Sequence, residues 1–451
     1  MQTNILGYPR IGSRRELKKA CESFWSGNIT EDELLKTGTA IKQQNWKFLK
    51  EAGIDLIPSN DFSFYDQVLD ATFMVGAIPV RYSSLQNDKL ALYFAMARGY
   101  QRNGKDITAM EMTKWFDTNY HYIVPEFIKA QTFSPFYNKA LEEYKEGKSQ
   151  GIETKPVLLG PVSYLLSGKE KEEGFHRLEL LERLLPVYVN LLQELEEAGA
   201  SWVQLDEPFL VTDIDEKTKK AYNEAYSAIR KACPHLKLLV ATYFEGLRDN
   251  MPLAVQLPVD ALHIDLVRAP YQLDDVLLQL PEGKILSLGV VDGRNIWKND
   301  FDKSLSMIRK AVDQLGEGRV MVAGSSSFLH VPYDLDQETN EKTLSPEIKQ
   351  WMAFAKQKTE ELVLLKKLAE GTPSVEKALE TNRRIMKEKS TSTLIHNQKV
   401  EERCAAVSDE DAKRKSPFSQ RKTKQQQKLH LPSYPTTTIG SFPQTSAIRL
   451  A

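Results

Sequence analysis

The sequence predicts an α/β fold, an eight-stranded (βα)8 TIM barrel followed by a helical inter-domain linker. Short apolar runs recur along the chain before Leu335, and most are continuous rather than alternating. Continuous runs are typical of strands buried on both faces of a parallel sheet. Amphipathic stretches separate these runs, and the composition after Leu335 becomes rich in charged and polar residues.

The predicted strands are apolar stretches bounded by Gly, Pro or acidic residues. They are Asn4–Gly7, Ile54–Ser59, Val157–Gly160, Val203–Asp206, Leu238–Tyr243, Ala261–Asp265, Ile285–Val290 and Val320–Ser325. Eight βα units in succession favour a closed barrel. A doubly wound open sheet is the alternative, but Gly7–Gly12 does not fit the G-x-G-x-x-G pattern that often follows its first strand.

Helical spacing of apolar residues predicts helices at Leu178–Leu195 and Ser304–Leu315. Pro186 lies inside the first of these, so we expect a kink or a break there. The segment Asp61–Lys155 is too long for one helix, and we expect additional helices in it.

The barrel domain is predicted to span residues 1–335, and a helical linker residues 336–430. Ser345–Gly371 reads as one long helix that begins at Pro346, and Ser374–Lys389 as a second. Residues 401–428 are mostly charged or polar, which is typical of a solvated connector.

Residues 431–451 are predicted to be the truncated start of a second barrel. Ile439-Gly-Ser-Phe-Pro-Gln444 echoes Ile5-Leu-Gly-Tyr-Pro-Arg10, because each has a glycine before an aromatic-proline pair. A repeated barrel would begin this way.

Composition excludes several classes of protein. A net charge of −1 argues against a nucleic-acid binder, and no apolar run is long enough for a membrane span. Cys21, Cys233 and Cys404 are far apart, so neither a disulfide framework nor a thiolate zinc site is indicated. With no signal peptide visible, a cytoplasmic location is expected.

Functional groups of such a barrel gather where the strands end. The candidates at this rim are Tyr8, Arg10, Asn60, Asp61, Asp206, Glu207, Thr242, Glu245, Asp265, Asp292, Arg294, Ser325, Ser327 and His330. Adjacent strand residues point to opposite faces, so only one of Asp206 and Glu207 should face the mouth. We expect His263 to be a hydrogen-bonded interior residue rather than a metal ligand.

The first helix is predicted to begin with a capping box, Ser13 and Glu16. Leu17, Ala20, Cys21 and Phe24 form its buried face, and Arg14, Arg15, Lys18 and Lys19 crowd its first turns. Cations at a helix N-terminus oppose the helix dipole unless an anion compensates them. The cluster is therefore either a solvated basic face or a site for a multiply anionic ligand.

Several long strings carry a resemblance to a known family. They are Leu6-Gly-Tyr-Pro-Arg-Ile-Gly12, Arg15-Glu-Leu-Lys-Lys19, the aromatic and cationic segment Glu111–Glu126, Lys155-Pro-Val-Leu-Leu-Gly-Pro161, Trp202-Val-Gln-Leu-Asp-Glu-Pro208, Thr242-Tyr-Phe-Glu-Gly246 and Thr436–Thr445. Together they resemble the cobalamin-independent methionine synthases. The resemblance implies transfer of a methyl group from 5-methyltetrahydropteroyltri-L-glutamate to L-homocysteine by two barrels, of which the second holds zinc.

The resemblance also implies residue roles. It implies folate-tail contacts at Arg15, Glu16, Leu17, Lys18 and Lys114, and homocysteine contacts at Ile439, Gly440 and Ser441. The zinc ligands would lie beyond residue 451, so no metal, no catalytic residue and no activity are expected of this chain alone, which would need its missing C-terminal barrel. Ser326 and Ala447 stand where many members have Cys and Glu.

Two other functions remain open at this point. The first is a self-sufficient barrel lyase or hydrolase that uses Asp206, Glu207 or Asp265, which predicts a carboxylate with a strongly shifted pKa in a closed pocket. The second is a non-catalytic binding module.

Overall fold

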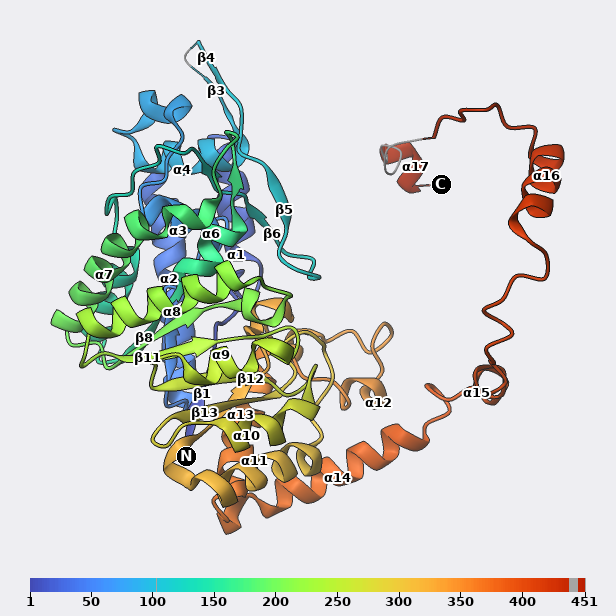
Figure 1. The fold of residues 1–451 in the computed structure, drawn as a ribbon. Coiled ribbons are helices and arrows are strands. Elements are labelled where there is room, and N and C mark those ends of the chain that lie inside the picture. Colours follow the sequence, from blue (N-terminus) through green and yellow to red (C-terminus); the bar gives the residue numbers. More distant parts are fainter. Residues whose placement is uncertain (103, 438–444, 451) are drawn as a thin grey trace. The chain divides into compact units, whose positions relative to one another are not determined.

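A computed structural model describes residues 1–102, 104–437 and 445–450 of the chain. These residues form two compact units, Met1–Lys387 and Glu388–Ala451. The first unit holds the barrel, and its strands lie at the centre of a ring of helices (Figure 1).

Eight parallel strands form the barrel, as predicted. They are β1 (Gln2–Asn4), β2 (Ile57–Ser59), β8 (Thr154–Leu159), β10 (Trp202–Asp206), β11 (Lys237–Ala241), β12 (Ala261–Asp265), β13 (Ile285–Val291) and β14 (Val320–Gly324). Their order is β1-β14-β13-β12-β11-β10-β8-β2, and a parallel bridge between Asn4 and Leu56 brings β1 back to β2. The (βα)8 prediction is confirmed, and the open-sheet alternative is wrong.

The first strand begins two residues earlier than predicted. Residues after Asn4 leave the sheet because their backbone groups bond to other loops: Tyr8 N–H, for example, donates to the Asp61 carboxylate at 2.7 Å. Gly7 instead accepts from Phe328 N–H through its carbonyl, at 2.9 Å. The motif Leu6–Gly12 is therefore a rim loop and not a strand.

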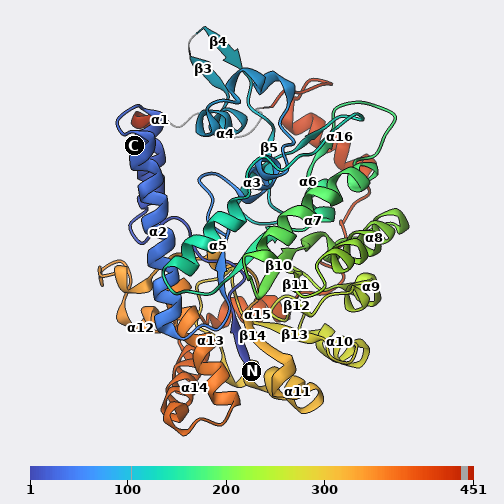
Figure 2. The same ribbon diagram turned by 90° about the vertical axis from the view of Figure 1, so that its left-hand side faces the viewer.

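Helices cover the outside of the sheet (Figure 2). They are α2 (Glu31–Ala52), α5 (Lys139–Ser149), α6 (Pro161–Ser167), α7 (Leu181–Glu197), α8 (Glu216–Ala232), α9 (Met251–Gln256), α10 (Leu273–Gln279) and α11 (Phe301–Leu315). A kink or a break was expected at Pro186, and the break is absent because α7 continues through this residue. Leu184, Leu191 and Leu195 anchor this helix in the main core, and their burial outweighs the single backbone bond that proline cannot make.

The second βα unit carries a large insertion. It contains α3 (Gln67–Met74), α4 (Lys89–Arg98), the hairpin β3 (Tyr100–Arg102) with β4 (Lys105–Ile107), and the hairpin β5 (Met112–Lys114) with β6 (His121–Ile123). Helices were expected here, and the hairpins are additional. The insertion shares its own hydrophobic cluster with α1 (Glu16–Trp25) and part of α2.

The predicted helix Ser345–Gly371 is two helices, α12 (Pro346–Lys349) and α13 (Ala355–Ala369). The chain leaves helical geometry between them because Met352 forms an antiparallel bridge with Trp297. Ala353 N–H also donates to Ile296 O at 2.8 Å. Leu362 and Leu365 of α13 lie in the main core, so the compact first unit includes part of the predicted linker.

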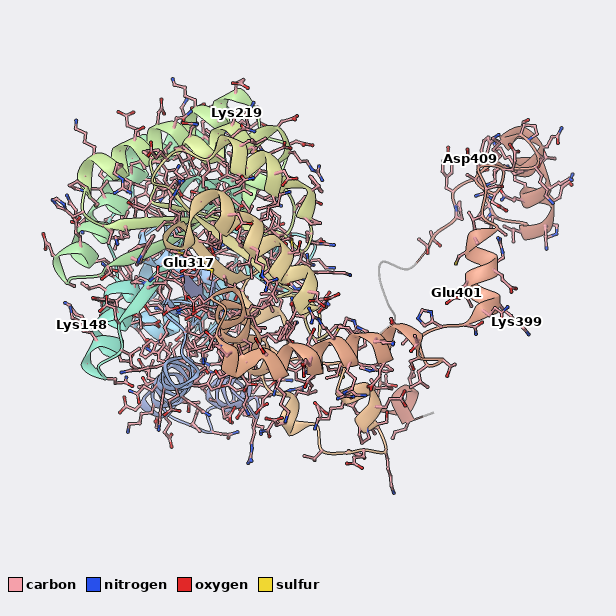
Figure 3. All side chains as sticks on the ribbon, turned by 90° about the horizontal axis from the view of Figure 1, so that it is seen from below. Lys148, Lys219, Glu317, Lys399, Glu401 and Asp409 are labelled. Carbon is pink, nitrogen blue, oxygen red and sulfur yellow. The ribbon has the colours of Figure 1, made fainter. Side chains whose placement is uncertain are left out.

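The predicted helix Ser374–Lys389 is present as α14 (Glu376–Thr391). The second unit contains α15 (Gln398–Ala405), α16 (Phe418–Leu429) and α17 (Ser446–Leu450). None of its described residues is buried, and Lys399 and Glu401 lie on α15 with their side chains in solvent (Figure 3). No helix among the described residues is both long and apolar enough to span a membrane.

Candidate functional site

A small hollow lies at the mouth of the barrel, where the strands end. Four of its residues were predicted rim residues: Arg10, Asp206, Ser327 and His330. The others are Asp66, Gln67, Trp115, Tyr120, His121, Tyr122, Tyr243 and Leu329. Four of these, Trp115 and Tyr120 to Tyr122, belong to the β5–β6 hairpin, which therefore forms one wall of the mouth.

The loop of this hairpin, residues 115–120, contacts the loops that follow five consecutive strands. The Phe116 ring lies 5.1 Å from Phe209, after β10, and 5.8 Å from Phe244, after β11. The Tyr120 ring meets His330, after β14, edge-on at 5.5 Å. Aromatic pairs at these separations are favourable.

Two arginines from the remaining two loops also contact the loop of the hairpin, through Asp117. Arg268, after β12, donates to the Asp117 carboxylate at 2.7 Å. Arg294, after β13, donates to the other carboxylate oxygen at 2.7 Å and to the Asp117 carbonyl at 3.2 Å. The β5–β6 hairpin thus covers the end of the barrel where enzymes of this fold bind their substrates.

Arg10 connects this hairpin to the loop after β1. Its guanidinium is 6% exposed, donates to Tyr65 O at 2.5 Å and lies 5.3 Å from the centre of the Tyr120 ring. A buried guanidinium over an aromatic face is a favourable cation–π pair. Arg10 is therefore a structural part of the mouth.

Asp206, the last residue of β10, and Glu207, which follows it, point to opposite sides, as predicted. Asp206 lines the mouth hollow and accepts from Gln204 at 2.7 Å and from Tyr243 O–H at 3.1 Å. Glu207 is fully buried outside the barrel, where it accepts from Ser163 N–H at 2.8 Å and Tyr226 O–H at 2.9 Å. Burial raises the pKa of Asp206 to about 6 and that of Glu207 to about 7.

Asp265, the third candidate carboxylate, orders a loop. It accepts backbone N–H groups of Phe244 at 3.1 Å, Val267 at 2.9 Å and Arg268 at 2.9 Å. Burial raises its pKa to about 6. Of the three candidate acids, only Asp206 lines the mouth hollow, so no pair of them is placed there for acid–base catalysis.

Polar side chains fill the barrel beneath the mouth. Lys155 donates to Asn4 Oδ1 at 2.5 Å, to Ile5 O at 3.1 Å and to Gln204 Oε1. His263 contacts Ser287 Oγ at 3.0 Å, and burial lowers the pKa of its imidazole to about 3. The expected interior role of His263 is thus confirmed. No group of three or more His, Cys, Asp or Glu side chains among the described residues could hold a metal ion.

The start of the first helix differs from the predicted capping box. Helix α1 begins at Glu16, and Arg15 precedes it in left-handed geometry with φ 62°. Glu16 does not cap from the third helical position; its carboxylate accepts from Arg14 N–H at 2.8 Å and from the Ser13 hydroxyl at 3.4 Å. The capping box is wrong because the chain folds back on itself before the helix starts.

The side chains of this segment divide into buried and exposed groups. Arg14, Arg15, Lys18 and Lys19 are exposed, whereas Leu17 is 5% exposed and packs in the insertion's core. Because its side chain is buried, Leu17 could contact a ligand only through its backbone atoms. Its N–H already donates to Ile11 O at 3.1 Å.

Lys114 is exposed at the end of β5 and faces His121 across the hairpin. The hairpin and the start of α1 share a support, because Leu17 of α1 and Ile123 of β6 belong to the same hydrophobic cluster. The predicted homocysteine residues Ile439, Gly440 and Ser441 lie outside the described part of the chain. Ser326 is buried, with no hydrogen-bond partner for its hydroxyl, and Ala447 lies on α17.

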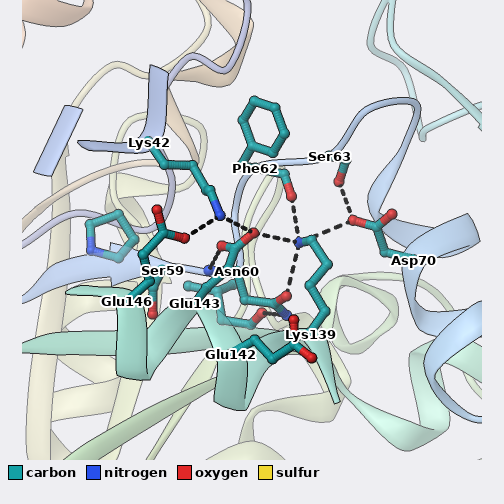
Figure 4. A network of polar contacts seen from close by, with 12 residues as sticks. Lys42, Ser59, Asn60, Phe62, Ser63, Asp70, Lys139, Glu142, Glu143 and Glu146 are labelled. Atoms are coloured by element: carbon teal, nitrogen blue, oxygen red, sulfur yellow. Dashed lines mark hydrogen bonds and ion pairs between the residues drawn. The ribbon is translucent and has the colours of Figure 1, made fainter. Parts of the chain in front are cut away.

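A second, larger hollow lies beside α2 and α5, and it shares no lining residue with the hollow at the mouth. Lys42 and Lys139 line it, and their ammonium groups lie in one network of polar contacts (Figure 4). Lys139 donates to Asn60 Oδ1 at 2.9 Å and Phe62 O at 2.6 Å, and its ammonium is 3.3 Å from Glu143. This network uses the predicted rim residue Asn60 to attach α5 to the loop after β2.

The segment Glu111–Glu126, which carries part of the family resemblance, supplies Trp115 and Tyr120 to the mouth, but Asp66 and Tyr243 were not predicted as mouth residues. Asp66 caps the N-terminus of α3, and its carboxylate accepts from Val68 N–H at 2.8 Å and from Ile123 N–H at 3.0 Å. Its place before a helix was the available signal. Nothing local marks Tyr243, because its role depends on Asp206.

Comparisons with known proteins agree on one family. A family model described as "Cobalamin-independent synthase, N-terminal domain" matches residues 2–316. The chain is 56% identical to a 5-methyltetrahydropteroyltriglutamate–homocysteine methyltransferase of Flavobacterium johnsoniae, over 100% of this chain and 59% of that protein. It is 58% identical to the protein of the same name in Cytophaga hutchinsonii, with the same coverage.

Solved structures show the fold. A putative vitamin-B12 independent methionine synthase of Listeria monocytogenes aligns with a TM-score of 0.53 and 14% identity, over 81% of this chain and 98% of that one. The chain spans 59% of the length of the two curated relatives above.

Proposed function

This chain belongs to the cobalamin-independent methionine synthase family, and from that premise we propose that it forms the N-terminal part of a methyltransferase. The reaction moves the methyl group of 5-methyltetrahydropteroyltri-L-glutamate to L-homocysteine and forms L-methionine. The chain matches its curated relatives along its whole length, and their names state these substrates.

The task of this part is to bind the anionic triglutamate tail. One observation carries the proposal: exposed cations gather at the start of α1, and Lys114 stands exposed on a hairpin that shares a hydrophobic core with that helix. Arg15, Lys18 and Lys114 supply the charge. Glu16 and Leu17 contribute by shaping the loop and anchoring the helix. Lysine and arginine are the natural partners of a flexible polyanion.

The closed mouth supports this assignment over a self-sufficient lyase or hydrolase. The hairpin loop covers the strand ends, and Glu207 and Asp265 are engaged in structural hydrogen bonds. A ligand is then expected at the edge of the barrel and not at its centre. Of Asp206, Glu207 and Asp265, only Asp206 lines the hollow, so no pair of these three acids is placed there for acid–base work.

Homocysteine binding at Ile439, Gly440 and Ser441, and a partner barrel, complete the proposal. Zinc, when bound in that partner, would ionise the homocysteine thiol, since the thiolate is the nucleophile. The described residues of this chain do not fit a zinc site. They serve to hold the folate, so we expect no methionine formation by this chain alone.

The test compares the affinity of the chain for methyltetrahydrofolate with one glutamate and with three. We expect the triglutamate to bind more tightly, and Lys18→Ala and Lys114→Ala each to weaken it about fivefold to tenfold. Lys47→Ala is the matched control, because Lys47 and Lys18 are both exposed lysines that pair with a glutamate four residues on, at 3.9 and 3.7 Å.

Two results would overturn the proposal. Equal affinity for both folates would remove the tail site, and so would equal effects of the Lys18, Lys114 and Lys47 substitutions. Methionine formation by this chain, with homocysteine, methyl-folate triglutamate and zinc supplied, would contradict its assignment as a non-catalytic part.

A further inference from the structure

The β5–β6 hairpin is attached to the protein at both of its ends. At the base, Ile123 N–H donates to the buried Asp66 carboxylate at 3.0 Å, and the Ile123 side chain is buried in the insertion's hydrophobic cluster. Each strand of the hairpin has only three residues. A two-stranded ribbon of this size is marginally stable by itself, so its geometry depends on contacts with the rest of the protein.

At the tip, one carboxylate receives two arginines. Arg268 and Arg294 reach Asp117 from the loops after adjacent strands, each at 2.7 Å, and each uses a different carboxylate oxygen. Arg294 also donates to the Asp117 backbone carbonyl at 3.2 Å. Bonds to both the side chain and the main chain restrain the direction of the loop, which aromatic contacts alone do not.

Lys114 lies between these two attachments. It is the last residue of β5, three positions before Asp117, and its side chain is exposed. Phe116 stands between them with φ 51°, which a phenylalanine rarely adopts, so the loop conformation is imposed by its surroundings. If the tip were released, the strand carrying Lys114 would pivot about the base.

We propose that Asp117 is a positioning residue: by holding the hairpin tip to Arg268 and Arg294, it fixes Lys114 where the polyglutamate tail binds. The inference rests on the proposed function for its ligand, but the docking of the hairpin can be measured without any ligand. Asp117, itself an anion, would thus support the binding of another anion without contacting it.

The charge of Asp117 makes the test decisive, because two effects have opposite signs. Through the electric field alone, removal of a negative charge near the site would tighten the binding of a polyanion, and it would also release two arginines. Through positioning, the same removal loosens Lys114 and weakens binding. The direction in which Asp117→Asn changes the triglutamate affinity therefore distinguishes the effect of charge from the effect of positioning.

The experiment uses the full chain and three variants. Asp117→Asn removes the charge, and Asp117→Glu keeps it on a longer side chain. Asp302→Asn is the matched control, because Asp302 is also an exposed carboxylate held by an arginine, with Arg383 nitrogens at 2.7 and 2.8 Å, and it lies on α11. Amide hydrogen exchange of residues 112–123 reports docking, and titration with 5-methyltetrahydropteroyltri-L-glutamate reports binding.

We expect Asp117→Asn to speed exchange in residues 112–123 and to weaken triglutamate affinity by about threefold to tenfold. Asp117→Glu should change the exchange rate and the triglutamate affinity less than Asp117→Asn does. Asp302→Asn should change neither the exchange rate nor the affinity. Tighter binding by Asp117→Asn, unchanged exchange, or faster exchange with unchanged affinity would each overturn the inference.

Failure of the proposed function has a different signature. In that case the unsubstituted chain would bind the monoglutamate and the triglutamate equally, while the exchange experiment would still show whether Asp117 docks the hairpin.

Discussion

Asp206 is the last residue of β10 and Glu207 follows it, yet their carboxylates point to opposite sides, one into the barrel and one out of it. Asp206 bonds to Gln204 and Tyr243 inside the barrel, whereas Glu207 bonds to Ser163 and Tyr226 outside it. The strand geometry that separates them gives the two acids different consequences when they are replaced.

Glu207→Ala should destabilise the fold without any direct effect on a ligand. It leaves Ser163 N–H and Tyr226 O–H without their acceptor in a buried place, at a cost of about 2–3 kcal/mol in the free energy of unfolding. Urea denaturation followed by circular dichroism measures the change. Glu207→Gln should cost less, because its amide oxygen can still accept. An alanine variant as stable as the parent would show that Glu207 is not an important buried acceptor.

Gly160→Ala should also destabilise the chain, through the same carboxylate. A Cβ at this position would lie 2.0 Å from Glu207 Oε1, whose own bonds prevent it from moving away freely. Overpacking of this kind costs about 1–3 kcal/mol. Gly318→Ala is the control, since a Cβ there meets nothing within 4 Å. Denaturation midpoints that shift equally for both variants would contradict the close packing around Gly160.

Lys155 should make stability rise with pH in the alkaline range. Burial lowers the pKa of its ammonium to about 7, while in the unfolded chain the pKa is near 10.5. Between these values the unfolded state binds one proton more than the folded state, so unfolding becomes less favourable as pH increases. The difference in unfolding free energy between the parent and Lys155→Met, measured from about pH 7 to about pH 9.5, should therefore change in favour of the parent. No change in this difference would mean that Lys155 keeps an ordinary pKa.

Acid should release the hairpin tip. Partial burial raises the pKa of Asp117, but the hydrogen bond and charge of Arg294, with the charge of Arg268, outweigh this and leave the pKa below its usual value. The carboxylate therefore contributes its stabilisation above the unfolded pKa, and the contribution is lost as pH falls through the folded pKa. Pepsin cleavage within residues 115–122 should accelerate as pH falls below about 4. Asp117→Asn should be cleaved readily throughout, and an identical pH profile for this variant would contradict the assignment.

Salt should weaken triglutamate binding more than monoglutamate binding. The proposed contacts, Arg15, Lys18 and Lys114, are exposed, and exposed charges are screened within about 8 Å at physiological ionic strength. Titrations of both folates at low and at high salt measure the difference. Equal salt dependence of the two would indicate that the extra glutamates do not meet these cations.

The sequence by itself determined the number and order of the barrel strands. Continuous apolar runs such as Ala261–Asp265 reflect burial on both faces, and this requirement acts on each strand separately, so it can be read from local pattern. The opposite orientation of Asp206 and Glu207 was predictable for the same reason. Predictions failed where distant contacts overrode local preference: at Pro186, where core packing carries α7 through, and at Met352, where a bridge to Trp297 divides a helix.

The candidate site also has one part that the sequence predicts and one part that depends on the tertiary structure. The basic start of α1 is visible in the sequence because Arg14, Arg15, Lys18 and Lys19 are close along the chain. Only the tertiary structure decided that a hairpin closes the barrel mouth. Asp117 and Arg294 are 177 residues apart, and no local pattern marks either as the partner of the other. Their contact exists because the barrel places the loops after successive strands side by side, so the closure of the sheet determines which charges meet.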